Sequence, residues 1–148
     1  MSTLALVHAY RTSDAYYIVP NDQTVDGLWV NGTQVKRVPI DTPAIELGRM
    51  VLSALGEGDH ARARISDWKG LLKPLLGAAC AASWSAFSRK SELIVIKREE
   101  EGLVVTPTRH GGTSGNDKGF HELGEHAVHM KADSDPRKVG ALLLGVWA

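Results

Sequence analysis

The stretch that decides the fold class is Leu93-Ile94-Val95-Ile96-Lys97-Arg98-Glu99-Glu100-Glu101-Gly102-Leu103-Val104-Val105-Thr106-Pro107. Two runs rich in aliphatic and β-branched residues flank a polar tip, which is the pattern of a β-hairpin. The side chains of Glu99, Glu100 and Glu101 cannot all enter a core, so the tip is expected to be solvated. The sequence therefore predicts an antiparallel hairpin in the middle of the chain.

The N-terminal third of the chain predicts further strands. Short apolar runs at 4–10 and 15–19 flank a turn-prone polar segment, which indicates another hairpin. A third strand over 27–31 ends at Asn31-Gly32, the dipeptide most typical of a two-residue hairpin turn, and 34–38 returns from it. The expected arrangement is an antiparallel meander.

The hydrophobic pattern changes to a helical period after the meander. Thr42 is a candidate N-cap, Pro43 takes the first helical position, and apolar residues recur at helical spacing up to Gly56. An Ala-rich stretch over 71–82 predicts a second helix, in which Pro74 must lie in the first turn or break the segment.

The remaining elements follow from local signals. Ser83 is the expected N-cap of a short helix, and Asp135-Pro136 opens a last one. Residues 108–119 form a long Gly- and Ser-containing loop, and a strand is expected over 126–132. The fold class is thus α+β, with the meander and the central hairpin in an antiparallel sheet packed with three to four helices.

Composition restricts the class of protein. The chain has 148 residues, 43% of them hydrophobic and 23% charged, which predicts a single folded domain over 1–148 rather than a disordered chain. Lys+Arg and Asp+Glu both number 17, so nucleic acid is not expected as a direct partner. The single cysteine, Cys80, indicates a reducing cytoplasm, and neither a signal peptide nor a membrane span is expected.

Two motifs resemble catalytic or metal-binding patterns. His121-Glu122-Leu123-Gly124-Glu125-His126 places its second histidine five residues after the first, about 140° away around a helix, whereas a shared zinc needs a spacing of four. His126 and His129 would face opposite sides of the expected strand. No metal site is predicted.

Ser66-Asp67-Trp68-Lys69 has the Ser-x-x-Lys spacing of a lysine-activated serine, but the elements that accompany that motif in known hydrolases are absent. A turn capped by Ser66 or Asp67, with Trp68 in the core, is the favoured interpretation. Cys80, among alanines, is expected to be a small core residue. No cofactor or small-molecule substrate is predicted, and a hydrolase using Ser66 and Lys69 or a ligand-binding module stay as alternatives.

A family resemblance covers nearly the whole chain in order. It rests on the following pieces: Tyr17-Ile18-Val19-Pro20, Thr24-Val25-Asp26-Gly27, Glu46-Leu47-Gly48, Asp67-Trp68-Lys69, Lys73-Pro74-Leu75-Leu76, Ser83-Trp84 with Phe87, Thr106-Pro107, Lys118-Gly119-Phe120 and Val139-Gly140-Ala141-Leu142. In these pieces the sequence resembles the immunity proteins of bacterial contact-dependent growth inhibition (CDI). It departs from the pattern at 60–64 and in the loop over 111–117.

The resemblance implies a non-enzymatic cytoplasmic protein that binds the C-terminal toxin domain of a CDI effector, one to one, and blocks it. The toxin would be a nuclease, of the class that often acts on tRNA, whose basic cleft suits an acidic inhibitor surface. Trp68, Trp84 and Phe87 are assigned to the core. The expected toxin-binding residues are Glu99, Glu100, Glu101, Asp117, His121, Glu122 and Glu125.

Overall fold

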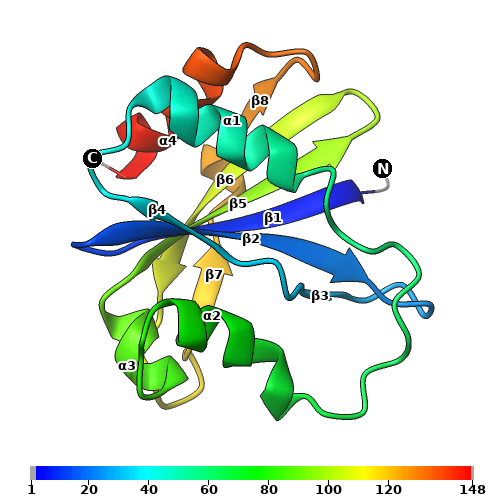
Figure 1. The fold of residues 1–148 in the computed structure, drawn as a ribbon, viewed down its shortest axis with the longest axis vertical. Coiled ribbons are helices and arrows are strands. Elements are labelled where there is room, and N and C mark those ends of the chain that lie inside the picture. Colours follow the sequence, from blue (N-terminus) through cyan, green and yellow to red (C-terminus); the bar gives the residue numbers. More distant parts are fainter. Residues whose placement is uncertain (1–2, 148) are drawn as a thin grey trace.

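The fold is an antiparallel sheet with helices on both faces (Figure 1). A computed structural model of the chain describes residues 3–147, apart from the side chain of Lys69. The strands are β1 (Thr3–Arg11), β2 (Ala15–Gln23), β3 (Trp29–Asn31), β4 (Lys36–Pro39), β5 (Glu92–Glu99), β6 (Gly102–His110), β7 (Phe120–Glu122) and β8 (Val128–Met130). The helices are α1 (Ala44–Ala54), α2 (Lys73–Ala78), α3 (Trp84–Arg89) and α4 (Pro136–Trp147), with 3-10 turns η1 (Lys69–Leu72) and η2 (Gly124–His126).

The sheet has eight strands over the described residues, in the order β3-β2-β1-β5-β6-β7, with β4 also on β2 and β8 also on β6. Helices α1 and α4 cover one face, and α2 and α3 cover the other (Figure 1). The predicted α+β class is therefore confirmed. None of the helices in the described part of the chain combines the length and the hydrophobicity that a bilayer crossing needs.

The central hairpin forms as predicted. β5 pairs with β6 in a register that includes Ile96 opposite Val105, and the turn lies between Glu99 and Gly102. Gly102 has φ +144°, and a side chain there would overlap the carbonyl oxygen of Met130. Glycine is thus required both by the turn and by the close approach of β8.

The sheet separates two apolar clusters. On the α1/α4 face, Val7, Ile18 and Ile96 are fully or almost fully buried against the two helices. On the α2/α3 face, Tyr10 and Phe87 pack edge to face with their ring centroids 5.3 Å apart. Each face therefore has its own core.

The predicted turn at Asn31-Gly32 is wrong. β3 and β4 do not pair with each other; both pair with β2, at Asn21–Gln23 and at Ala15–Ile18, and so form one interrupted edge strand. The chain reverses earlier, where Gly27 has φ +89° and the Thr24 hydroxyl accepts a hydrogen bond from the Leu28 N–H at 3.0 Å. Gly32 instead lies against the Pro20 carbonyl, where a side chain would overlap.

The helix over 44–54 is confirmed with a different cap. Pro43, not Thr42, occupies the N-cap position, and its carbonyl accepts from the Leu47 N–H at 3.0 Å. Helix α1 packs on α4 through two glycines: side chains at Gly48 and Gly140 would overlap the carbonyl oxygens of Pro136 and Ala44. Small residues let these two helix backbones approach closely.

The segment between α1 and α3 contains most of the corrections. The predicted helix over 71–82 is split into η1 and α2, with Pro74 in the first turn of α2, and it ends at Ala78 because Cys80 adopts φ +50°. Cys80 is exposed, so its assignment to the core was wrong. Ser83 caps α3 as predicted, by accepting from the Ala86 N–H at 3.1 Å.

Of the three aromatic residues assigned to the core, Phe87 is buried and Trp84 packs partly buried against the same cluster. Trp68 is 56% exposed, so its assignment was wrong. It lies directly before η1, and the turn there is held instead by Asp67, whose carboxylate accepts from the Gly70 N–H at 3.1 Å.

The last third contains one further difference. The predicted strand over 126–132 is shorter: His126 belongs to η2, and only Val128–Met130 pairs with β6. The preceding loop runs from Gly111 to Gly119, between β6 and β7. Helix α4 begins at Pro136, as predicted.

Candidate functional site

The glutamates at the hairpin tip form the first part of the predicted site. Glu99 ends β5, and Glu100 and Glu101 make the turn, where both are exposed. None of the three forms an ion pair with a described side chain. The tip therefore presents three carboxylates that no internal ion pair occupies.

A cleft of about 220 Å³ lies beside this tip, between the hairpin and β8. Glu99, Glu101 and His129 contribute polar groups to its lining, and Leu103 and Met130 contribute apolar ones. The apolar walls with carboxylates at one end match the two parts of a lysine or arginine side chain, whose stem is apolar and whose head is charged.

Asp117, in the loop before β7, is neutralised within the protein. Arg109 donates two hydrogen bonds to its carboxylate, at 2.7 and 2.9 Å, and this guanidinium lowers the pKa of Asp117. The ring of His121 bonds to the Asp117 backbone carbonyl at 2.7 Å. The structure thus brings two of the predicted site residues together, but as a loop-stabilising group.

Glu122 and Glu125 lie along the outer side of β6. Glu122 receives a hydrogen bond from Lys97 at 3.0 Å, and Glu125 lies 4.0 Å from His126 in η2, where both are exposed. Glu122 is opposite Thr108, near the far end of β6 from the tip. At about 3.4 Å per residue, the nine-residue β6 separates the tip from the loop by about 27 Å, so the seven residues form a line along one sheet edge rather than one cluster.

His8 is a half-buried polar residue of the sheet that the sequence reasoning did not single out. It lies in β1, and burial lowers its pKa to about 4, with the charges of Glu122 and Lys97 as smaller opposing influences. Its Nδ1 atom is buried and has no hydrogen-bond partner among residues 3–147. An apolar strand with one histidine gives no sequence signal for this environment.

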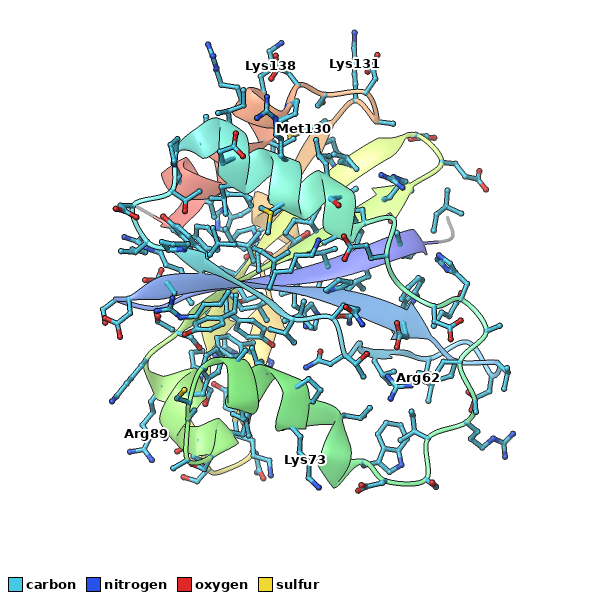
Figure 2. All side chains as sticks on the ribbon, viewed as in Figure 1. Arg62, Lys73, Arg89, Met130, Lys131 and Lys138 are labelled. Carbon is cyan, nitrogen blue, oxygen red and sulfur yellow. The ribbon has the colours of Figure 1, made fainter. Side chains whose placement is uncertain are left out.

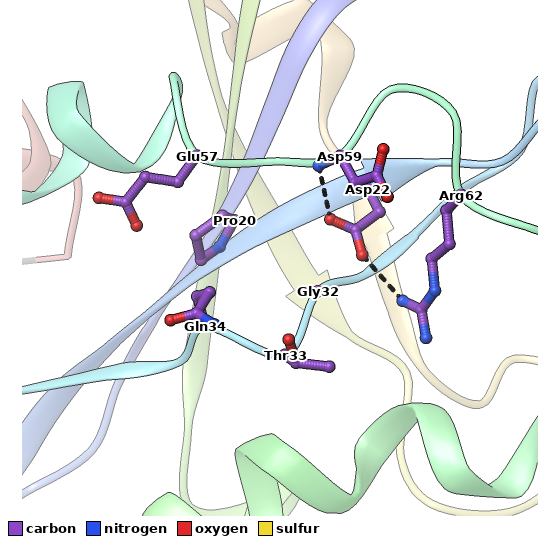
Figure 3. A pocket seen from close by; sticks show the side chains of 8 residues that line it. All are labelled: Pro20, Asp22, Gly32, Thr33, Gln34, Glu57, Asp59 and Arg62. Atoms are coloured by element: carbon purple, nitrogen blue, oxygen red, sulfur yellow. Dashed lines mark hydrogen bonds and ion pairs between the residues drawn. The ribbon is translucent and has the colours of Figure 1, made fainter.

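A second cleft, of about 360 Å³, lies where the edge strand is interrupted (Figure 3). Asp22 joins its walls by accepting from the Asp59 N–H and from Arg62, both at 2.9 Å. Arg62 also donates to the Asn31 carbonyl at 3.0 Å. Because Asp22 and Arg62 are 40 residues apart, no local pattern could have revealed this pair.

The metal-binding alternative is not supported by the described residues, and the side chain of Lys69, which the hydrolase alternative requires, lies outside the described part of the chain. The stretch from His121 to His126 forms a strand end and a 3-10 turn rather than a helix. No group of three or more potential metal ligands occurs among the described residues. Ser66 is exposed in an irregular segment, and its neighbour Asp67 is engaged in the turn with Gly70.

Exposed cations lie at the two helical ends of the molecule (Figure 2). Lys131 and Lys138 project beside α4, and Lys73 and Arg89 project from α2 and α3. None of these four forms an ion pair with any residue in 3–147. Lys131 directly follows β8, whose Met130 carbonyl lies against Gly102, so one of these unpaired cations borders the acidic hairpin tip.

Comparisons with solved structures identify similar folds. A chain of the CdiA-CT/CdiI toxin and immunity complex from Yersinia pseudotuberculosis superposes with a TM-score of 0.72 and 16% identity, over 97% of this chain and 95% of that one. The protein of unknown function NMB0488 from Neisseria meningitidis gives 0.73 and 18%, over 96% and 92%. No protein-family model and no curated protein matches the sequence. At these identities the similarity shows a shared fold.

Proposed function

We propose that this protein is a CDI immunity protein, which binds its cognate toxin domain one to one and blocks it without catalysis. The observation that carries the proposal is the fold match to a chain of a toxin and immunity complex over nearly the full length of both chains. The sequence resemblance, which covers the same length, supports it. In this function residues 1–148 act as one cytoplasmic domain.

The proposed toxin-binding surface is centred on the hairpin tip. No ion pair within the described residues has to be broken before Glu99, Glu100 and Glu101 can pair with a partner. In this proposal the cleft beside the tip receives a basic side chain of the toxin, whose stem contacts Met130 and whose head meets Glu99 and Glu101.

Asp117, His121, Glu122 and Glu125 are proposed as further contacts along the same edge. A typical interface covers about 800 Å² per partner, or a patch about 30 Å across, so one toxin domain can reach both the tip and the loop about 27 Å away. The paired carboxylates Asp117 and Glu122 contribute less than the tip, since binding must compete with Arg109 and Lys97.

The proposed toxin class is a nuclease, with tRNA as the candidate substrate, because a cleft that binds phosphates is basic and attracts an acidic inhibitor surface. Such attraction accelerates association and weakens as salt rises. Its contribution is greatest for exposed charges that approach the partner first. The tip glutamates meet this condition.

The test is the association rate with the toxin domain encoded beside this protein's gene, measured by stopped flow at low and high salt. Reversing two tip charges, in Glu100→Lys with Glu101→Lys, should slow association at least tenfold at low salt and reduce its salt dependence. Glu122→Lys should have a smaller effect. Glu46→Lys, an exposed change on α1, is the matched control.

Equal rates for wild type and the tip variant at both salt concentrations would move the interface away from the tip. If the complex still formed, the immunity function would stand and only this surface would be wrong. The side of the N-terminal meander that carries Asp14, Asp22 and Asp26 would then be the next surface to test.

A further inference from the structure

The loop between β6 and β7 has a conformation fixed by its own backbone. The Gly111 N–H donates to the Gly119 carbonyl at 2.8 Å, and the Gly119 N–H donates to the Gly112 carbonyl at 3.0 Å. Gly112 and Gly115 have φ values of +95° and +86°, in the left-handed region that favours glycine. The loop over 111–119 is therefore a specified structure rather than a connection of arbitrary path.

Polar side chains at the base of the loop hold this conformation. Arg109 donates two hydrogen bonds to the Asp117 carboxylate, at 2.7 and 2.9 Å, and the His121 ring bonds to the Asp117 backbone carbonyl at 2.7 Å. On the other side of the loop, His110 Nδ1 accepts from the Gly112 N–H at 3.0 Å. Both ends of the loop are thus tied to strand residues.

The loop apex, Thr113-Ser114-Gly115-Asn116, is exposed at every residue. Within residues 3–147, no side chain of the apex takes part in a hydrogen bond. Ordering a segment costs conformational entropy, and burial of apolar side chains, which usually offsets that cost, does not occur at this apex. An exposed segment that is ordered in advance suits binding, because a partner then does not have to order it.

We propose that the loop apex contacts the toxin domain through its hydroxyl and amide groups, and that Arg109 and Asp117 are positioning residues that fix the apex for this contact. The inference rests on the proposed immunity function. The apex carries no charge, and Lys118 beside it forms no ion pair with a described side chain, so a basic cleft would not attract this surface. The complementary toxin surface is neutral and polar, and lies beside the basic cleft.

The test compares dissociation rates of the complex with the toxin domain encoded beside this protein's gene. Ser114→Ala combined with Asn116→Ala removes two hydrogen-bonding groups from the apex and should speed dissociation about tenfold. The association rate and its salt dependence should not change, because no charge is altered. Gln34→Ala, a neutral change at an exposed residue near the opposite sheet edge, is the matched control and should leave both rates unchanged.

The positioning role is tested with Arg109→Met, which removes both hydrogen bonds to Asp117 at similar side-chain length. In the free variant, ¹⁵N relaxation should show increased backbone mobility over 112–116, without a change in the urea midpoint of unfolding. Dissociation from the toxin domain should become at least threefold faster. Adding Arg109→Met to the apex variant should have little further effect, because an apex without its contact groups gains nothing from being positioned.

An apex variant that dissociates as slowly as Gln34→Ala would overturn the inference, while the complex formed by the wild type would leave the immunity function standing. Effects of Arg109→Met and the apex change that simply multiply would overturn the positioning role. If Arg109→Met does not fold, Asp117→Asn takes its place in the same comparison. If the wild type formed no complex, the immunity function would be wrong, and this inference with it.

Discussion

Protonation of His8 should couple the stability of the fold to pH. The pKa of this imidazole is about 4 in the folded protein and 6.5 in the unfolded reference, because burial disfavours the charged ring. The folded state therefore prefers the neutral form. The stabilisation is complete above pH 6.5 and is lost as the pH falls towards 4, because the unfolded chain takes up the proton first.

The two pKa values set the size of the effect. Proton linkage gives a loss of about 2 kcal/mol at pH 5 and about 3 kcal/mol at pH 4, relative to neutral pH. The charges of Glu122 and Lys97 act on its pKa in opposite directions, and a smaller contribution from the Asn31 side chain raises the pKa. Burial is thus the dominant cause.

Urea unfolding of wild type and His8→Gln at pH 7.0, 5.0 and 4.0 measures this loss. Other groups, such as Glu57 with its lowered pKa, also reduce stability in acid, so the difference between the two proteins isolates His8. The wild type should lose about 2 kcal/mol more than the variant between pH 7.0 and 5.0. Parallel pH dependences of the two proteins would refute the burial argument.

Three further predictions concern packing and partner contacts. Phe87→Ala should lower the free energy of unfolding by about 3–5 kcal/mol, whereas Trp68→Ala, at an exposed position, should cost less than about 1 kcal/mol in chemical denaturation. Gly140→Ala should lower the free energy of unfolding by about 1–3 kcal/mol or more, because the new methyl group would overlap the Ala44 carbonyl. Gly77→Ala, which lies in open space on α2, should raise it by up to about 1 kcal/mol. Equal thermal stabilities of the two variants would contradict the close α1–α4 contact. Ser66→Ala should leave protection against the toxin unchanged. If the folded variant still binds the toxin but no longer protects cells, the hydrolase alternative would be favoured.

Local patterns predicted the elements whose signals agree with their surroundings. The two apolar runs over 93–107 form the central hairpin, and the helical spacing between Pro43 and Gly56 forms α1. Ser83 caps its helix because the cap needs only a hydroxyl and a nearby backbone N–H. These features depend on residues close together in sequence.

The predictions that were wrong concern segments whose structure depends on contacts with residues distant in sequence. The dipeptide at Asn31-Gly32 has a strong turn signal, but the turn at Gly27 reverses the chain first and the edge of β2 pairs with both following segments. Trp68 has the composition of a core residue, yet its burial depends on whether another element covers it, and none within residues 3–147 does so fully. Burial of this kind is not encoded in a four-residue motif.

In the candidate site, too, features set by neighbouring residues were predicted and features set by distant residues were not. The exposure of Glu100 and Glu101 followed from the hairpin alone, because consecutive tip residues cannot all point inward. The pairing of Asp117 with Arg109 and of Glu122 with Lys97 depends on the path of the chain after β6, which composition does not reveal. The sequence therefore predicted that the tip carboxylates are exposed, but it did not predict which of the other carboxylates form internal ion pairs.

Calorimetric titration with the toxin domain encoded beside this protein's gene, combined with a growth assay of cells that express both, tests the central claim most directly. We predict a saturable one-to-one complex and restored growth in the cells that carry the intact protein. Absence of binding heat at several temperatures, together with continued growth arrest despite folded protein in the cells, would contradict the immunity function.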